Sequence, residues 1–294
     1  MWRTIFKISA YVIYGLAAFI VFVYLLLPYD LLRQRAVEYM SQGPIKLDIA
    51  SLSPALLPGL NLRNVRVSLR QPNASPEVLY LQTLRTWPHW LSLLSPAKRF
   101  GFTGQLYNGR ISGSVQYTQR DGTTDWDINL ENVDVSRHAL LQEMQQKNQL
   151  TVEGRLSGTA NTRFTKTGQL AQGDIDFDVQ PAIFTPGALF HAIVPNPIPC
   201  DNLKGTAVRT RREWQIQGVT CQGDDILIDL RGTLRPRGTW NASVPNLRIT
   251  AKSDSAFRTE LNNLSQLAIQ RPLGEDGEVK FGLRGRLDNL RPVR

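Results

Sequence analysis

Apolar and polar residues alternate with a period of two through most of the chain after residue 43. The alternation is regular in residues 60–70, apart from one slip at Asn64, and it returns in residues 126–130, 174–179, 213–217, 226–231 and 279–284. This period places the apolar side chains of a strand on one face. A sheet of such strands has one dry and one wet face, as antiparallel sheets do. The pattern predicts a mainly β protein with a long, twisted and curved antiparallel sheet or partial barrel.

Helical spacing is rare after residue 43, and we expect a few short helices. The candidates are residues 87–94, 136–148, 187–194 and 254–268. Glycines recur where turns or bulges should fall. Two short motifs also recur, since GRISG at 109–113 returns as GRLSG at 154–158, and LRGTL at 230–234 returns as LRGRL at 283–287. The echoes favour a repeated hairpin module, although such short motifs are also common in unrelated β proteins.

The N-terminal segment is the longest apolar stretch. Residues 8–27 contain no charged side chain, and twenty helical residues span roughly 30 Å, the thickness of the hydrocarbon core of a bilayer. We expect a membrane anchor here, with apolar positions at Ile8, Tyr11, Val12, Leu16, Phe19, Val23 and Leu27. Arg3 and Lys7 favour a cytoplasmic N-terminus. A cleaved signal peptide and a buried helix are the alternatives.

This topology divides the chain into a cytoplasmic N-terminus (1–7), a transmembrane helix (8–27) and a β-rich domain outside the cytoplasm (28–294). Residues 181–199 contain five prolines, which favours a boundary between two halves, 43–180 and 200–294.

Composition and charge narrow the class of partner. Apolar residues make up 42% of the chain and charged residues 20%, which is ordinary for a globular protein. The formal net charge of +9 favours an anionic partner. Outside the cytoplasm that partner is anionic lipid or another envelope protein, and nucleic acid is not expected. The candidate anionic contacts are Lys98, Arg99, Arg209, Arg211 and Arg212.

Reactive motifs are missing from the sequence. We find no nucleophile elbow, phosphate loop or metal-binding spacing, and His89, His138 and His191 lie far apart. The prediction is therefore a non-enzyme with no catalytic, cofactor or metal site. Asp174, Asp176 and Asp178 would form an acidic row on one strand face, which is either solvated or binds a divalent ion.

The two cysteines, Cys200 and Cys221, are 21 positions apart. In an oxidising compartment two such cysteines usually pair, and the alternative is two separate buried thiols.

The order of elements resembles a known family. The apolar segment followed by GPIKLDIASLS (43–53) and GLNLRNVRV (59–67) is similar to the start of AsmA-like envelope proteins. The later order of GRISG, LTVEGRLSG (150–158), the block from Leu203 to Leu234 and DGEVKFGLRGRLDNLR (276–291) resembles the type II secretion system protein N family of Gram-negative bacteria.

The resemblance implies a single-pass inner-membrane protein with a periplasmic domain. Its role would be binding and scaffolding among the other subunits of a protein-export apparatus. The AsmA-like kinship implies an alternative, an apolar groove that binds or transfers lipid. If Trp87, Trp90 and the helix bearing Phe257, Leu261 and Leu264 fill that groove, scaffolding is favoured, and an open groove favours lipid.

Overall fold

The computed structural model places the chain in two compact units, Met1–Pro88 and His89–Arg294. It describes residues 11, 14–15, 18–19, 22, 24, 26–40, 45–55, 59–69, 77–146, 150–167, 169–186, 197–210, 212–237, 239–253, 257–270, 272–274, 276–286 and 289–293. The chain is mainly β, with antiparallel pairing and few helices, as the alternation predicts.

The first unit contains one helix and three strands. They are α2 (Tyr29–Met40), β1 (Ile45–Pro54), β2 (Leu60–Leu69) and β3 (Glu77–Pro88), with β1 paired to β2 and β2 to β3. Arg33 of α2 donates to the carbonyl oxygens of Ile49 and Ala50 on β1. The slip in the alternation at Asn64 is a backbone irregularity, because Asn64 has a φ of 50° and lies outside the paired register.

The predicted anchor is described only in part. Ile8, Val12, Leu16 and Val23 lie outside the described residues. Tyr11 and Phe19 are helical and exposed, and Leu27 precedes α2. In the part of the chain that the structure describes, no helix has the length and apolar character needed to cross a bilayer.

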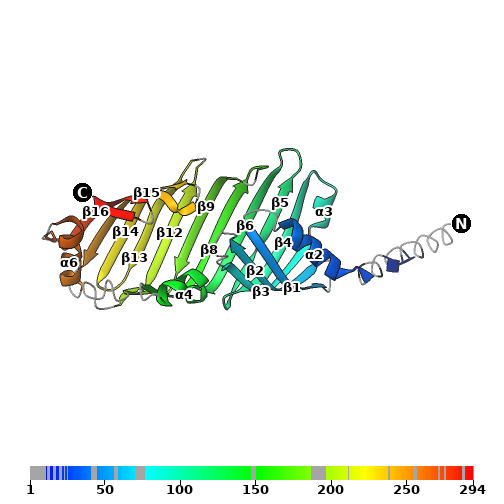
Figure 1. Cartoon of the computed structure of the whole chain (residues 1–294), viewed down its shortest axis with the longest axis horizontal. Coiled ribbons are helices and arrows are strands. Elements are labelled where there is room, and N and C mark those ends of the chain that lie inside the picture. Colours follow the sequence, from blue (N-terminus) through cyan, green and yellow to red (C-terminus); the bar gives the residue numbers. More distant parts are fainter. Residues whose placement is uncertain are drawn as a thin grey trace. The chain divides into compact units, whose positions relative to one another are not determined.

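The second unit is dominated by one antiparallel sheet in which each strand pairs with the next in space (Figure 1). Its described strands are β4 (Ala97–Leu106), β5 (Gly109–Thr118), β6 (Thr123–Asp134), β8 (Arg155–Phe164), β9 (Leu170–Val179), β12 (Asn202–Arg209), β13 (Trp214–Gln222), β14 (Ile226–Arg237), β15 (Thr239–Ser253), β16 (Glu278–Arg286) and β17 (Asn289–Val293). The six alternating segments named above form strands of the two units, except that Glu213 precedes β13 and residue 70 lies outside the described residues, which confirms the period-two interpretation.

The segments between sheet strands are placed unequally at the two rims. At one rim, which we call the insertion rim, the chain leaves the large sheet in three long connections. Between β6 and β8 it forms η1 (Val135–Arg137), α4 (Ala139–Gln146) and β7 (Leu150–Glu153). Between β9 and β12 it forms β10 (Ala182–Pro186) and β11 (Ile198–Cys200), and between β15 and β16 it forms α6 (Arg258–Ile269). The opposite hairpin rim has short connections such as 119–122, 165–169 and 210–213, and α3 (Trp90–Leu93) precedes β4 there (Figure 1).

The helices occur near the predicted segments but are shorter. The 136–148 segment forms α4 behind η1, and Asp134 caps η1 by accepting the backbone N–H of Ser136. The 254–268 segment forms α6, and 87–94 contains only α3. The 187–194 segment lies outside the described residues.

Both sequence echoes fall at constrained glycines on strands that run in the same direction. A Cβ at Gly113 on β5 would overlap the carbonyl oxygen of Asp127 on β6, and one at Gly158 on β8 would overlap that of Asp176 on β9. Gly232 on β14 and Gly285 on β16 have φ of 146° and 116°, a region that favours glycine. The repeated motifs therefore mark close strand approach and twist.

A disulfide joins Cys200 on β11 to Cys221 on β13, with 5.4 Å between their Cα atoms. Both half-cystines are buried with Val179 and Ala182. The bond attaches the small sheet β11–β10–β7 to β13, an interior strand of the large sheet, at the insertion rim.

The expected boundary at 181–199 does not divide the sheet. β9 and β12, the strands on either side of this stretch, pair directly with each other, for example Val179 with Leu203. The compact units instead divide at Pro88 and His89. The sequence pattern missed this because the proline-rich stretch is an insertion that returns to the next position in the sheet.

Candidate functional site

The sheet register places apolar residues in four rows across one face of the second unit. Row 1, along the insertion rim, contains Val133, Leu156, Val179, Leu203, Cys221, Ile228, Ala251 and Val279. Row 2 contains Gly104, Ile111, Leu130, Gly158, Phe177, Gly205, Val219, Leu230, Ile249 and Phe281.

Rows 3 and 4 continue toward the hairpin rim. Row 3 contains Phe102, Gly113, Ile128, Ala160, Ile175, Ala207, Ile216, Gly232, Leu247 and Leu283. Row 4 contains Phe100, Val115, Trp126, Thr162, Gly173, Arg209, Trp214, Leu234 and Pro245. Among these residues of the four rows, Arg209 is the single charged one.

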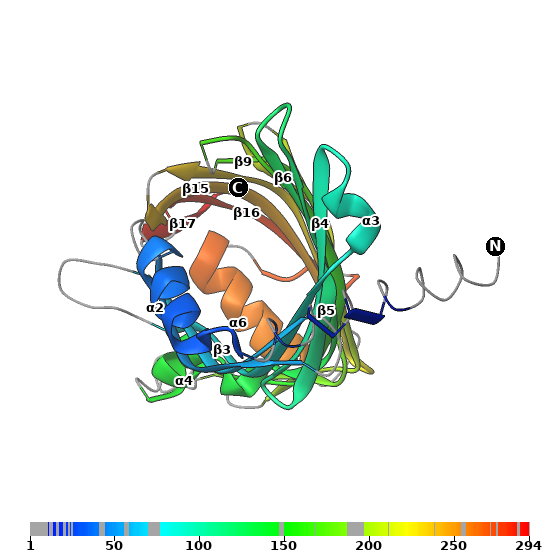
Figure 2. The same cartoon turned by 90° about the vertical axis from the view of Figure 1, so that its right-hand side faces the viewer.

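This face is concave. Leu261 of α6 packs with Ala251 and Val279 of row 1, and Figure 2 shows the strands curving around α6. We therefore call the four rows the concave face.

The insertion-rim side of the concave face is the better buried. In row 1, Val133, Val179, Cys221, Ala251 and Val279 are all buried. In rows 2 to 4 most large side chains are only half-buried, among them Ile111, Leu130, Ile128, Ile175, Ile216 and Leu230. The exposed fractions of Phe100 and Trp126 in row 4 are 44% and 36%. The middle of the concave face is therefore an apolar surface that the described residues cover only in part.

Trp90 and α6, two of the candidates for filling this face, lie apart within the second unit. α6 contacts β15, β16 and β17 at one end of the sheet, whereas α3, with Trp90, contacts β4 at the other. Trp87 lies on β3 in the first unit, and Leu261 is buried while Phe257 is half-buried. For Leu264, the side chain lies outside the described residues. Trp90 and α6 are thus separated, because their elements contact strands at opposite ends of the sheet.

Arg209 differs in its surroundings from the other basic candidates. Its guanidinium carbon lies 5.9 Å from the centroid of the Trp214 ring. Its Nε and Nη1 atoms are buried and have no hydrogen-bond partner among the described residues. An unpartnered buried polar group is costly, and a buried charge more so.

The remaining basic candidates are separated from Arg209. Lys98 donates to the Leu93 carbonyl oxygen at 2.5 Å, and Arg99 donates to the Ser114 hydroxyl at 3.0 Å. Both lie on β4, five strand steps from β12, or roughly 24 Å at the usual strand spacing. Arg212 is exposed in the β12–β13 hairpin, and Arg211 lies outside the described residues. The described members of this set therefore do not form one basic cluster.

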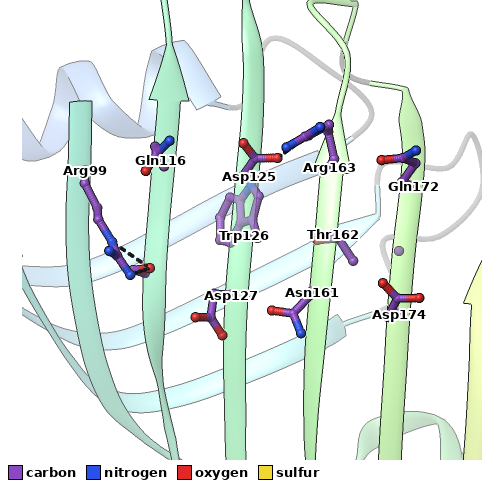
Figure 3. Close-up of a pocket in the computed structure, with 12 residues that line it drawn as sticks. Arg99, Gln116, Asp125, Trp126, Asp127, Asn161, Thr162, Arg163, Gln172 and Asp174 are labelled. Carbon is purple, nitrogen blue, oxygen red and sulfur yellow. Dashed lines mark hydrogen bonds and ion pairs between the residues drawn. The ribbon is translucent and has the colours of Figure 1, made fainter. Parts of the chain in front are cut away.

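A polar depression of about 410 Å³ lies on the opposite face, over β4 to β9 (Figure 3). Arg163 donates to Asp125 there, and the hydrogen bond and the negative charge raise the pKa of Arg163 above its ordinary value. Arg99 is held by Ser114 on the same face. Four of the polar lining side chains, Arg99, Ser114, Asp125 and Arg163, thus bond to one another in pairs.

The acidic row likewise makes ordinary surface contacts. Thr206 donates to Asp176, and Gln180 donates to Asp178. In the searched, described part of the chain, no group of three His, Cys, Asp or Glu side chains is placed to hold a metal ion. His89 is exposed before α3, and the His138 ring contacts Tyr107 with centroids 5.9 Å apart. His191 lies outside the described residues.

A second apolar surface, the α3 patch, consists of Trp90, Leu91 and Leu94. Their exposed fractions are 57%, 89% and 91%. Three large apolar side chains at this exposure in one short segment are unusual for a free protein surface. The sequence indicated a short helix over residues 87–94 but not the exposure of these side chains.

In the sequence Arg209 stands out only as one of several nearby basic residues. Its place on the apolar face of the sheet was not recognised. The alternation along β12 could have shown this, because Arg209 lies two positions after Ala207 and four after Gly205, and alternate residues of a strand share one face. No family model, curated protein or solved structure matches this chain, so its assignment rests on the geometry described above.

Proposed function

We propose that the second unit is a non-enzymatic envelope module that binds the acyl chains of a lipid on its concave face. The observation that carries the proposal is the half-exposed apolar surface of rows 2 to 4. Apolar side chains on this scale are stabilised by contact with another apolar surface. Lipid fits because the rows are long, continuous and almost without polar groups.

The N-terminal segment supports a membrane location for the module. Residues 8–27 carry no charge, and Tyr11, Tyr14, Phe19, Phe22 and Leu26 are exposed. Exposed aromatic and aliphatic side chains of this kind suit a helix whose surroundings are lipid. The proposal is thus of a single-pass inner-membrane protein with the β-rich part in the periplasm.

Lipid binding should depend on the apolar character of row 3. Ile128 is half-buried between Gly113 and Ala160 of the neighbouring strands, so Ile128→Gln places an amide in the middle of the concave face. We expect copurified lipid to fall at least fivefold, because the amide loses hydrogen bonds to water when acyl chains cover it. The measurement is native mass spectrometry with lipid extraction on the full chain purified from a bacterial envelope.

Asn129→Gln is the matched control, since residue 129 is adjacent on β6 but faces the polar side. It should retain wild-type lipid content. A wild-type protein that carries no lipid would refute the proposal, and equal lipid in the two variants would show that lipid binds elsewhere.

A second candidate, a scaffold subunit of a type II secretion system, is favoured by the α3 patch. An exposed apolar patch with a tryptophan is typical of a protein–protein interface. The patch lies on the hairpin rim, apart from the rows proposed to bind lipid. The resemblance of the chain to the protein N family points to partners in the inner-membrane platform.

The α3 patch should therefore be dispensable for folding and required for assembly. Leu91→Glu with Leu94→Glu should change the free energy of unfolding by less than about 0.5 kcal/mol, because both side chains are exposed. Cross-links formed in cells from a photoreactive residue at position 95 to a secretion subunit should be lost. Gln119→Glu, on an exposed turn of the same rim, controls for added negative charge. Unchanged cross-links in the double variant would contradict an interface role.

A further inference from the structure

We propose that Arg209 binds the phosphate of a phospholipid headgroup on the concave face. This inference rests on the proposed lipid-binding function and specifies its ligand as an anionic phospholipid. Arg209 is the one charged residue among those of the four rows, and its neighbours there are apolar or uncharged.

The guanidinium lacks a protein anion among the described residues. Nε and Nη1 are buried without a hydrogen-bond partner there, and the guanidinium lies over the Trp214 ring. Gly173 and Trp214 flank Arg209 on the neighbouring strands, and neither has an anionic side chain. Glu213, the nearest acidic residue along the hairpin, is paired with Arg235 at 3.3 Å.

A phosphate would supply the missing acceptors. A guanidinium offers parallel N–H donors that match two phosphate oxygens, and hydrogen bonds between charged groups are the stronger kind. The indole ring under the guanidinium adds a cation–π contact and shields one side from water. A single cation on an apolar face suits a ligand with one anionic group and long apolar chains.

The position of Arg209 matches the dimensions of such a lipid. Arg209 lies in row 4 beside the hairpin rim, and Leu203 lies in row 1 on the same strand, six residues away. Six strand residues span roughly 20 Å, and the chains of one bilayer leaflet extend about 15 Å, half of the hydrocarbon core. A phosphate at Arg209 therefore leaves room for acyl chains down to the buried disulfide cluster at the insertion rim.

The experiment compares phosphatidylglycerol and diacylglycerol with matched chains, offered in equal amounts to the delipidated full chain. Wild-type protein should bind phosphatidylglycerol at least tenfold better than diacylglycerol, measured by native mass spectrometry. Arg209→Gln should lower phosphatidylglycerol binding about tenfold and leave diacylglycerol binding unchanged. Arg212→Gln, which removes the same charge from the exposed side of the hairpin, should bind as wild type.

A thermal measurement separates ligand recognition from folding. In lipid-free protein, Arg209→Met should melt at or above the wild-type temperature, because the substitution removes a buried charge without a partner. On addition of phosphatidylglycerol, the melting temperature of wild type should rise more than that of Arg209→Met. Inorganic phosphate alone should raise neither, because it lacks the acyl chains.

The outcomes separate the role of Arg209 from the lipid-binding function on which that role depends. If Arg209→Gln binds phosphatidylglycerol as wild type does, the role of Arg209 is wrong and lipid binding stands. If no variant binds either lipid, the lipid-binding function fails and the inference fails with it. Stabilisation by inorganic phosphate but not by phosphatidylglycerol would also overturn it.

Discussion

Removal of the Cys200–Cys221 disulfide is expected to lower the free energy of unfolding by about 3 kcal/mol. The bond closes a loop with a sequence separation of 21, and in the chain-entropy model a loop of that size is worth roughly this amount. The double variant Cys200→Ala, Cys221→Ala is the cleanest test, because a single substitution leaves a reactive thiol. For a unit of about 200 residues the melting temperature should fall by about 6–12 °C.

The destabilisation caused by removing the disulfide should be greatest at the insertion rim. Cys200 and Cys221 share a buried cluster with Val179 and Ala182, and without the bond β11 keeps only this packing and its short pairing with β10. Hydrogen exchange should therefore increase most in β10 and β11. Dithiothreitol should reproduce the effect in wild type and have no effect on the double variant. Equal melting temperatures for reduced and oxidised wild type would contradict a stabilising role.

Gly113→Val is expected to destabilise the second unit by about 3 kcal/mol, at the upper end of the usual cost of overpacking. A Cβ at this position would overlap the carbonyl oxygen of Asp127 and lie 2.9 Å from the Phe102 ring. Backbone cannot yield as a flexible side chain does, so β5 must move away from β6. Hydrogen bonds between the two strands are lost as a result. Chemical denaturation followed by tryptophan fluorescence measures the change.

Gly218 supplies a matched control on β13. A Cβ at this position would have the Asp229 carboxylate as its nearest neighbour, 4.0 Å away, so Gly218→Ala has space around the new methyl group. Gly113→Ala and Gly218→Ala restrict the unfolded chain equally. The difference between their free energies of unfolding therefore measures the steric overlap in the folded state. We expect Gly218→Ala to change stability by less than about 0.5 kcal/mol, and similar losses in both variants would argue against the close approach of β5 and β6.

Both changes bear on the concave face in different ways. The disulfide joins row 1 at Cys221, beside the insertion rim, whereas Gly113 lies in row 3 next to Ile128. If lipid covers this face, bound phospholipid should offset part of the loss in each variant, because a ligand that binds only the folded protein stabilises it.

The strands were predictable because their signal is local. Alternation in residues 174–179 fixes which side chains share a face whatever lies beside them, and β9 forms there as expected. The slip at Asn64 and the glycine echoes were visible for the same reason, as each reflects backbone conformation at a single position. Helix ends were less certain, because α3 and α4 are short and their limits depend on the strands they contact.

The assembly of the site was not predictable to the same degree. The proline-rich stretch was mistaken for a boundary because sequence does not reveal that β9 and β12 meet across it. Trp90 and Leu261 were grouped by their apolar character, although their helices contact opposite ends of the sheet. Pairing between distant strands sets these positions, and no local pattern encodes it.

By itself, the sequence determined that this chain is mainly β, that its sheet has one apolar face, and that its two cysteines are available to pair. Each of these follows from residue type and spacing along a strand. Only the tertiary structure decided that the apolar face is concave, that its middle rows are half-exposed, and that Arg209 stands alone among them over Trp214. The physical reason is that burial and partnership depend on which strands become neighbours, and neighbours here are fixed by register across the whole sheet.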